Sequence, residues 1–183
     1  MKIIVLDRDG VINEDSDAYI KHPDEWHPVA GSLEAIVRLK RAGWTVAVAT
    51  NQSGIKRGYY DRAILSAMHQ KLQTLLASMD AQAKVDWISF SPYVGEDKSP
   101  CRKPNTGMLQ AIENRFGLSL AGAPMVGDTL ADMQVANAKN LTPYLVLSGK
   151  GQRTLATADP ILQNIPVFEN LSAVVEAILE RKV

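Results

Sequence analysis

Short apolar runs alternate along the chain with longer segments in which apolar residues recur every three or four positions. A short apolar run bounded by turn residues is typical of a buried strand, and the longer spacing is typical of a helix that packs on one face. The pattern predicts strands at residues 2–6, 45–49, 85–90, 124–126 and 143–147, and helices at 32–40, 61–79, 106–116, 131–139 and 171–181. This alternation predicts an α/β fold, a doubly wound parallel sheet with helices on both faces.

Two predicted helices carry clear end signals. Asp61 is a candidate N-cap of the helix at 61–79, and Gly43 is a candidate C-terminal cap of the helix at 32–40. The long helix is expected to bury one stripe of apolar side chains, formed by Ile64, Leu65, Met68, Leu72, Leu75 and Leu76.

Polar residues follow the strands in a repeated way. Asp7 and Asp9 close the first strand, Thr50 closes the second, Asp128 follows the fourth, and Lys103 precedes a helix. The carboxyl ends of parallel strands share one edge of the sheet, where open α/β folds bind ligands. Paired carboxylates there suit Mg²⁺, or a carboxylate nucleophile with a second carboxylate as proton carrier. The alternative is an ordinary surface turn, because Asp and Gly are common in turns.

Composition narrows the class of protein. The 183 residues suit one domain, expected to span 1–183, and the hydrophobic and charged fractions of 46% and 22% are ordinary for a globular chain. Acidic and basic residues balance at 20 each, so nucleic acid and anionic membranes are not expected partners. A single cysteine fits a reducing compartment. With no leader-like segment before the first strand, we expect a cytoplasmic protein, and we expect a monomer.

The order of these residues resembles the four motifs of the haloacid dehalogenase superfamily of phosphatases, over about residues 1–150. The first motif corresponds to Asp7 and Asp9, the second to Thr50, the third to Lys103 and the fourth to Asp128 with Asp132. Longer sequence segments around these motifs resemble those of the branch that contains heptose bisphosphate phosphatases and histidinol-phosphatases. The segments are Asp7-Arg8-Asp9-Gly10-Val11-Ile12-Asn13, Thr50-Asn51-Gln52-Ser53-Gly54-Ile55, Arg57-Gly58 and Cys101-Arg102-Lys103-Pro104.

The resemblance implies a Rossmann-like fold and a set of catalytic roles. Asp7 would be the nucleophile that forms an aspartyl-phosphate, and Asp9 the general acid and then the base. Thr50 would donate to a phosphoryl oxygen, and Lys103 would neutralise phosphoryl charge. Mg²⁺ would be held by Asp7, Asp128 and the backbone carbonyl of Asp9. Strand-end capping is the alternative for Thr50, and a solvated surface lysine is the alternative for Lys103.

Further residues are expected to contact substrate or to orient the catalytic groups. The predicted substrate-binding set is Asp15, Tyr19, Asn51, Gln52, Ser53 and Arg102. Asp132 is expected to orient Lys103 or a metal-bound water, or else to be an ordinary first-turn aspartate. Thr129 stands where the branch often carries lysine. The three histidines form no paired spacing and are not expected to be catalytic.

The gaps between the motifs are short. Neither of the first two gaps has room for a separate cap domain, so we expect a capless enzyme. A capless site favours a substrate that supplies its own contacts, or loops at 15–19 and 91–101 that order on binding. The implied activity is a Mg²⁺-dependent phosphatase of bacterial surface-polysaccharide precursor synthesis that acts on a heptose bisphosphate. Histidinol phosphate is the alternative substrate, and a phospho-ligand binding module without activity is the alternative of another class.

Many relatives in this branch carry a zinc-binding loop with four Cys and His ligands. Here Ser91, Tyr93 and Ser99 stand at three of those positions, beside the single thiol of Cys101. One thiol does not make a tetrahedral structural site. We therefore predict well under one zinc per chain in elemental analysis of the dialysed, untagged protein. A stoichiometric zinc that survives dialysis would contradict this interpretation of the loop.

Overall fold

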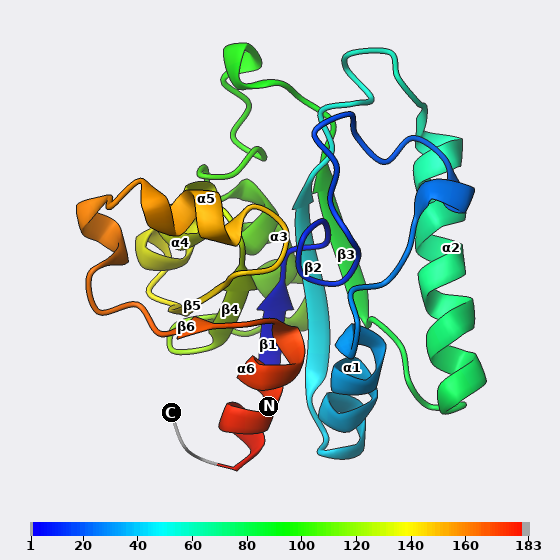
Figure 1. Ribbon diagram of the computed structural model, residues 1–183, viewed down its shortest axis with the longest axis vertical. Helices are drawn as coiled ribbons and strands as arrows, with labels where there is room; N and C mark the ends of the chain where they lie inside the picture. The colour runs from blue at the N-terminus through cyan, green and yellow to red at the C-terminus, as the bar shows by residue number, and fades with distance from the viewer. Residues whose placement is uncertain (1, 181–183) are drawn as a thin grey trace.

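A parallel six-stranded sheet forms the centre of the computed structural model, which describes residues 2–180 (Figure 1). The strand order is β3-β2-β1-β4-β5-β6, and every neighbouring pair is parallel. The strands are β1 Ile3–Leu6, β2 Thr45–Asn51, β3 Trp87–Ser91, β4 Pro124–Gly127, β5 Thr142–Val146 and β6 Val167–Phe168. The predicted doubly wound sheet is confirmed.

Residues 2–180 contain six α-helices, most of which cover the two faces of this sheet. They are α1 Ser32–Arg41, α2 Arg62–Met79, α3 Gly107–Phe116, α4 Leu130–Ala138, α5 Gly151–Ala156 and α6 Leu171–Leu179, with short 3₁₀ turns at Pro23–Glu25, Gly95–Asp97 and Pro160–Leu162. Buried side chains of α1, α2 and α6 pack on one face, and those of α3 and α4 pack on the other. Figure 1 shows α1 and α2 opposite α3 and α4 across the strands.

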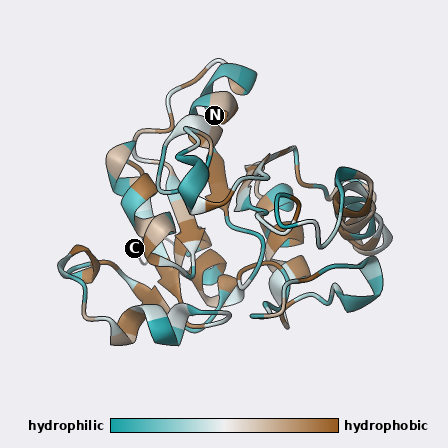
Figure 2. Ribbon diagram, turned by 90° about the horizontal axis from the view of Figure 1, so that it is seen from above, coloured by the Kyte–Doolittle hydropathy of each residue, from teal (hydrophilic) through white to brown (hydrophobic). Residues whose placement is uncertain are grey.

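The central strands supply side chains to both cores. In β1, Ile4 and Leu6 join the core under α1, α2 and α6, whereas Ile3 and Val5 join the core under α3 and α4. Alternate residues of a strand point to opposite faces, so a strand covered on both sides must be apolar throughout. Figure 2 shows this hydrophobic colour on the strands in the middle of the molecule.

Sequence and structure agree closely on the elements of the first 150 residues. Asp61 caps α2 by accepting a hydrogen bond from the backbone N–H of Ile64 at 2.8 Å, and Gly43 follows α1 with a φ of +77°. The sequence pattern did not predict α5 and β6. These elements have six and two residues, which is too few to show a periodicity. The predicted last helix begins at Leu171 as expected, and its predicted end at residue 181 lies outside the described residues.

Strand order places the polar strand ends together. From β1 the strands are added in one direction, through β2 to β3. The next strand, β4, lies on the other side of β1, so the direction in which strands are added reverses between β1 and β4. A crevice opens at the carboxyl edge at such a reversal point. Asp7 follows β1 and Asp128 follows β4, which puts one carboxylate on each side of this crevice.

No helix within residues 2–180 combines the length and the apolar content that crossing a bilayer requires.

Core packing of α2 gives a test of the fold. Leu72 is 1% exposed and packs among the residues of the α1, α2 and α6 core. We predict that Leu72→Ala lowers the free energy of unfolding by about 2–5 kcal/mol, because it removes buried methyl groups and leaves a cavity. The change is measured by urea unfolding. The matched variant Leu155→Ala, at a leucine 42% exposed, should change it by no more than about 0.5 kcal/mol. Equal effects of the two variants would contradict the packing.

Candidate active site

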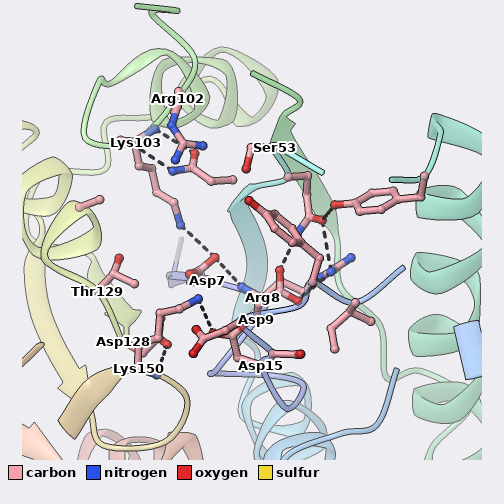
Figure 3. Close-up of a pocket in the computed structure, with 18 residues that line it drawn as sticks. Asp7, Arg8, Asp9, Asp15, Ser53, Arg102, Lys103, Asp128, Thr129 and Lys150 are labelled. Carbon is pink, nitrogen blue, oxygen red and sulfur yellow. Dashed lines mark hydrogen bonds and ion pairs between the residues drawn. The ribbon is translucent and has the colours of Figure 1, made fainter. Parts of the chain in front are cut away.

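A cavity of about 490 Å³ opens at the carboxyl edge of the sheet, over the reversal point between β1 and β4 (Figure 3). It brings together almost all residues that the sequence singled out. The predicted residues that line it are Asp7, Asp9, Asp15, Tyr19, Asn51, Gln52, Ser53, Arg102, Lys103 and Asp128. Thr50 is fully buried and is not part of the lining; its hydroxyl accepts a hydrogen bond from Gln52 at 2.9 Å.

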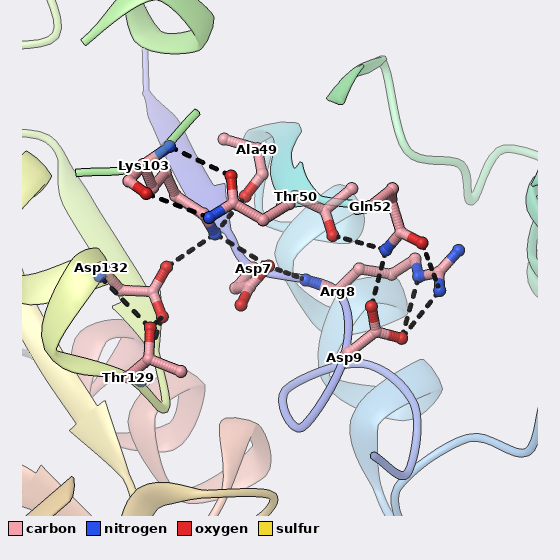
Figure 4. A network of polar contacts seen from close by, with 10 residues as sticks. Asp7, Arg8, Asp9, Ala49, Thr50, Gln52, Lys103, Thr129 and Asp132 are labelled. Carbon is pink, nitrogen blue, oxygen red and sulfur yellow. Dashed lines mark hydrogen bonds and ion pairs between the residues drawn. The ribbon is translucent and has the colours of Figure 1, made fainter. Parts of the chain in front are cut away.

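The ammonium group of Lys103 is buried and has three oxygen partners (Figure 4). Its Nζ lies 2.9 Å from Asp7 Oδ1 and 2.6 Å from Asp132 Oδ1, and it donates to the carbonyl of Ala49 at 2.6 Å. Burial alone would lower the pKa of Lys103, but the carboxylates of Asp132 and Asp7 raise it well above its usual value. Lys103 is therefore a permanent positive charge beside Asp7.

Two amide contacts place the backbone that carries this lysine. The side-chain carbonyl of Asn51 accepts from the Lys103 N–H at 3.0 Å, and its amide nitrogen donates to the Lys103 carbonyl at 3.1 Å. Asn51 sits at the last position of β2, so it ties the lysine loop to the sheet. The amide that is expected to contact substrate thus lines the cavity and also holds the backbone of Lys103.

Asp132 is held at the start of α4 by a capping box. Its Oδ2 accepts from the Thr129 hydroxyl at 2.6 Å and from the Thr129 N–H at 3.0 Å, while its Oδ1 faces Lys103. A Cβ on Gly127 would lie 2.2 Å from the Cβ of Asp132, so the residue before Asp128 must be glycine for α4 to approach. Both oxygens of Asp132 are committed to protein partners.

Asp7 and Asp128 belong to a cluster of buried carboxylates. Carboxylate oxygens of Asp7, Asp128 and Asp132 lie within 4.8 Å of one another, and Asp128 Oδ1 is buried with no hydrogen-bond partner. Burial raises the pKa of Asp7, and the charge of Asp132 raises it further. Burial and the charge of Asp7 raise the pKa of Asp128 in the same way.

The charge balance of this edge fits a divalent cation. Among the described residues at this edge, the carboxylates of Asp7, Asp128 and Asp132 are buried and that of Asp9 is partly exposed, and these four face the two cationic side chains of Arg8 and Lys103. Lys150 is paired with Asp15, so this pair leaves the balance unchanged. Two negative charges remain uncompensated, which is the charge of one Mg²⁺ ion, and oxygen is the ligand that Mg²⁺ prefers. Asp132 already bonds Lys103 and Thr129, so neither of its oxygens is left for an ion. The groups that fit the ion are therefore the unpartnered Oδ1 of Asp128 and the carboxylate of Asp7.

Two glycines make room for Asp128. A Cβ at Gly10 would lie 2.2 Å from Asp128 Oδ2, and a Cβ at Gly149 would lie 2.3 Å from the same atom. The φ angles of Gly10 and Gly149, +82° and +59°, also favour glycine. Asp128 Oδ2 accepts the backbone N–H of Lys150 at 2.7 Å, and its carbonyl accepts from the Thr154 hydroxyl. The segment before α5 therefore anchors the carboxylate.

Asp9 belongs to a separate network on the other side of Asp7. Its Oδ1 accepts from Arg8 at 2.7 and 3.2 Å and from Asn13 at 2.9 Å, and its Oδ2 accepts from Gln52 at 2.6 Å. Burial raises the pKa of Asp9, but the guanidinium of Arg8 and these hydrogen bonds outweigh it and lower the pKa below its usual value. Figure 4 shows the carboxylate turned toward Arg8 and Gln52, away from Lys103.

Sequence reasoning missed three members of this network. Arg8 is 1% exposed, and its Nη1 lies 3.4 Å from Nε2 of His69 on α2. Burial, reinforced by Arg8, lowers the pKa of His69 to about 4, so its ring stays neutral. Tyr60 donates to Gln52 Oε1 at 2.5 Å. The position of Arg8 between the two aspartates predicted to be catalytic was a usable signal. His69 and Tyr60 had no such signal, since only the fold brings them to the site.

The loop at 15–19 is joined to the α5 region by two ion pairs. Lys150 Nζ lies 2.5 Å from Asp15, and Arg153 contacts both carboxylate oxygens of Asp17 at 2.8 and 3.1 Å. Tyr19, in a left-handed backbone conformation with a φ of +66°, meets Tyr59 edge to face with ring centroids 5.1 Å apart. Lys150 lines the pocket and was not in the predicted site.

The loop at 91–101 is ordered by hydrogen bonds to its own backbone. Arg102 Nη1 donates to the Tyr93 carbonyl at 3.0 Å, and Asn105 Nδ2 donates to the Ser99 carbonyl at 2.9 Å. Asp97 accepts the Val94 N–H at 3.0 Å. These contacts hold the loop, in which Ser91, Tyr93 and Ser99 stand at three of the four zinc-ligand positions of the branch, and they keep the half-buried Arg102 at the cavity wall.

Comparison with known proteins agrees with this site. A family model described as HAD-hydrolase-like matches residues 100–174. A D-glycero-β-D-manno-heptose-1,7-bisphosphate 7-phosphatase of Pseudomonas aeruginosa is 49% identical over 97% of this chain and 98% of its own length. The solved structure of the D,D-heptose 1,7-bisphosphate phosphatase of Bordetella bronchiseptica, a complex with magnesium and phosphate, matches with a TM-score of 0.94 at 48% identity, over 99% of both chains.

A second solved structure, the D,D-heptose 1,7-bisphosphate phosphatase of Burkholderia thailandensis, matches with a TM-score of 0.75 at 41% identity, over 98% of this chain and 99% of that one. The similarity therefore extends over the whole fold and not only over the motifs. The chain belongs to the haloacid dehalogenase-like hydrolase family, in the branch of the heptose-1,7-bisphosphate 7-phosphatases.

Proposed function

We propose that this protein is a Mg²⁺-dependent phosphomonoester hydrolase that removes the 7-phosphate of D-glycero-D-manno-heptose 1,7-bisphosphate. The observation that carries the proposal is the buried contact of Asp7 with Lys103, set opposite Asp128 across the reversal point of the sheet. Full-length similarity to phosphatases named for this substrate supports the choice of substrate.

Asp7 is the proposed nucleophile. Its Oδ1 is engaged by the Arg8 N–H at 2.7 Å and by Lys103, and within residues 2–180 no hydrogen bond reaches its Oδ2. One oxygen is thus fixed while the other faces the cavity, ready to attack phosphorus in line and form an aspartyl-phosphate. Lys103 stabilises the charge on the transferring group because it is cationic before substrate arrives.

The ion would be held by Asp7, Asp128 and the backbone carbonyl of Asp9. When bound, Mg²⁺ shields the phosphate charge from the carboxylates that must approach it. The proposed role of Asp132 is to orient Lys103 and not to bind the ion, because both of its oxygens already have protein partners. Thr50 lies behind Gln52 and is proposed to donate its hydroxyl proton toward a phosphoryl oxygen.

Asp9 is the proposed general acid and base. It lines the cavity two residues after Asp7, on the same side of the extended chain, as Figure 3 shows. The pKa of Asp9 is low in the free protein, so its proton would be taken up beside the negative charge of the bound phosphate. Asp9 then gives this proton to the leaving alcohol as the bond to phosphorus breaks, and it accepts a proton from the water that attacks the aspartyl-phosphate.

Histidinol phosphate is the second candidate substrate. The charged residues of the loop at 15–19 help to decide between it and the bisphosphate. An ammonium group would seek acidic partners, and the loop at 15–19 offers Asp15 and Asp17. Both are already paired, with Lys150 and Arg153. Arg102 lies at the cavity wall, and its planar guanidinium can bond two oxygens of one phosphate. It is therefore suited to bind the second phosphate of a bisphosphate. These charges favour the bisphosphate.

We also propose that the protein works as a monomer in the cytoplasm. The single cysteine fits a reducing compartment, which supports the cytoplasmic part of this proposal. The sedimentation coefficient of the purified protein is the test of the monomer.

The nucleophile is tested by Asp7→Asn. This change keeps the shape of the side chain and removes its charge, so kcat should fall by at least about 10³-fold. Phosphate release is measured with Mg²⁺, then with EDTA, then after Mg²⁺ is restored; EDTA should abolish activity reversibly. Asp24→Asn, at a fully solvated aspartate far from the cavity, is the matched control and should be active. Full activity of Asp7→Asn or of the chelated enzyme would overturn the mechanism.

The substrate is tested by Arg102→Ala. Loss of a charged hydrogen bond to the distal phosphate should lower kcat/KM for heptose 1,7-bisphosphate by about 10- to 100-fold. Activity on histidinol phosphate should be much lower in the wild type and unchanged by the substitution. Arg41→Ala removes an arginine that pairs with Asp80 away from the cavity, and it serves as the control. A wild-type preference for histidinol phosphate, or no effect of Arg102→Ala on the bisphosphate, would refute the assignment.

A further inference from the structure

Gln52 is a buried amide whose hydrogen-bonding positions are all occupied. Its Nε2 donates to Asp9 Oδ2 at 2.6 Å and to Thr50 Oγ1 at 2.9 Å. Its Oε1 accepts from Tyr60 at 2.5 Å and from Arg8 at 3.3 Å. A glutamine offers two donors and two acceptor sites, so no position is left for substrate.

The direction of this amide is fixed by the chemistry of its neighbours. Arg8 has only donors, and the carboxylate of Asp9 has only acceptors, so a flipped amide would face both with the wrong group. Tyr60 is fixed in turn, because its ring packs on the backbone of Gly54, where a Cβ would lie 2.2 Å from the Tyr60 ring. A chain of contacts therefore runs from Tyr60 through Gln52 to Asp9. Figure 4 shows the part of it from Gln52 to Asp9.

The two oxygens of Asp9 are held unequally. Arg8 and Asn13 both donate to Oδ1, whereas Gln52 is the one donor to Oδ2 within the described part of the chain. Without Gln52, the carboxyl group would be held by one oxygen and would be free to rotate. Oδ2 keeps a second lone pair, so it can carry a proton while it still accepts from Gln52.

We propose that Gln52 is a positioning residue for Asp9, and that Tyr60 acts through Gln52. The inference rests on the proposed function and deepens it. As Asp7 forms its bond to phosphorus, the bond from phosphorus to the leaving oxygen breaks, and the electron pair stays on that oxygen. The proton of Asp9 passes to the same oxygen, and Gln52 keeps Asp9 in place for this transfer. Gln52 is thus not a substrate ligand, although its sequence position predicted one.

The leaving group gives the test. Phenyl, chlorophenyl and nitrophenyl phosphates are similar in size, but the phenols they release differ in acidity. The wild type and Gln52→Leu are compared by kcat/KM, which covers the steps up to release of the phenol. Loss of acid catalysis should lower kcat/KM by at least about tenfold for phenyl phosphate and by less than about threefold for nitrophenyl phosphate. A role in binding or folding alone would lower all members of the series by the same factor.

Tyr60→Phe provides a milder variant that keeps the glutamine in place. Its effect should be smaller, should follow the same trend along the series, and should add nothing to Gln52→Leu in the double variant, because Tyr60 acts through Gln52. Gln70→Leu, at an exposed glutamine on α2, makes the same change outside the cavity and should leave the series unchanged. Circular dichroism confirms that each variant is folded.

Each outcome decides the proposal. A uniform loss along the series, no loss in Gln52→Leu, or additive effects of the two substitutions would overturn the positioning role. An active wild type with an unaffected Gln52→Leu variant would refute this inference and leave the proposed function standing. A wild type that releases no phosphate from any substrate with Mg²⁺ would contradict both the positioning role and the proposed function.

Discussion

The active edge of this protein depends on one buried ammonium group. Lys103 lies between Asp7 and Asp132 and also bonds the Ala49 carbonyl, so it joins the ends of β1 and β2 to the start of α4. Removing such a charge from water is costly, and only a full set of partners offsets the cost. Loss of one partner from a buried ion pair typically costs about 3–5 kcal/mol, so the geometry of Asp7, the proposed nucleophile, and the stability of this edge are linked.

A second constraint is the crowding of carboxylates around Asp128. Gly10 and Gly149 contribute no side-chain atoms there, and their backbones close on the carboxylate from two sides. The group is held by the Lys150 N–H on one oxygen while the other has no protein partner. Negative charge is thus concentrated where a cation fits, and it is kept there by backbone atoms that cannot neutralise it.

The two proposed catalytic aspartates differ because their surroundings differ. Asp7 sits among other carboxylates with its charge partly balanced by Lys103, and its pKa is raised. Asp9, two residues along, is surrounded by donors from Arg8, Asn13 and Gln52. Asp9 lies in a tight turn that begins after Asp7, in which the Ile12 and Asn13 N–H groups bond the Arg8 carbonyl. Two similar side chains therefore receive different chemistry from the groups that surround each of them.

The sequence by itself determined the strands, the long helices and the polar residues at the carboxyl edge. Apolar runs covered on both faces are visible without a structure, and Asp7, Thr50 and Asp128 were recognisable because each stands where such a run stops. Helix ends such as Asp61 were also predictable, since a cap bonds a backbone group only three residues away.

Only the tertiary structure decided the strand order and the partners of the polar side chains. Gln52 and Asn51 were expected to contact substrate, yet Gln52 bonds Asp9 across 43 residues and Asn51 bonds Lys103 across 52. An amide both donates and accepts, so its sequence position does not reveal which groups surround it. Those groups are fixed by which strands lie side by side, and that arrangement follows from the packing of the whole sheet and its helices.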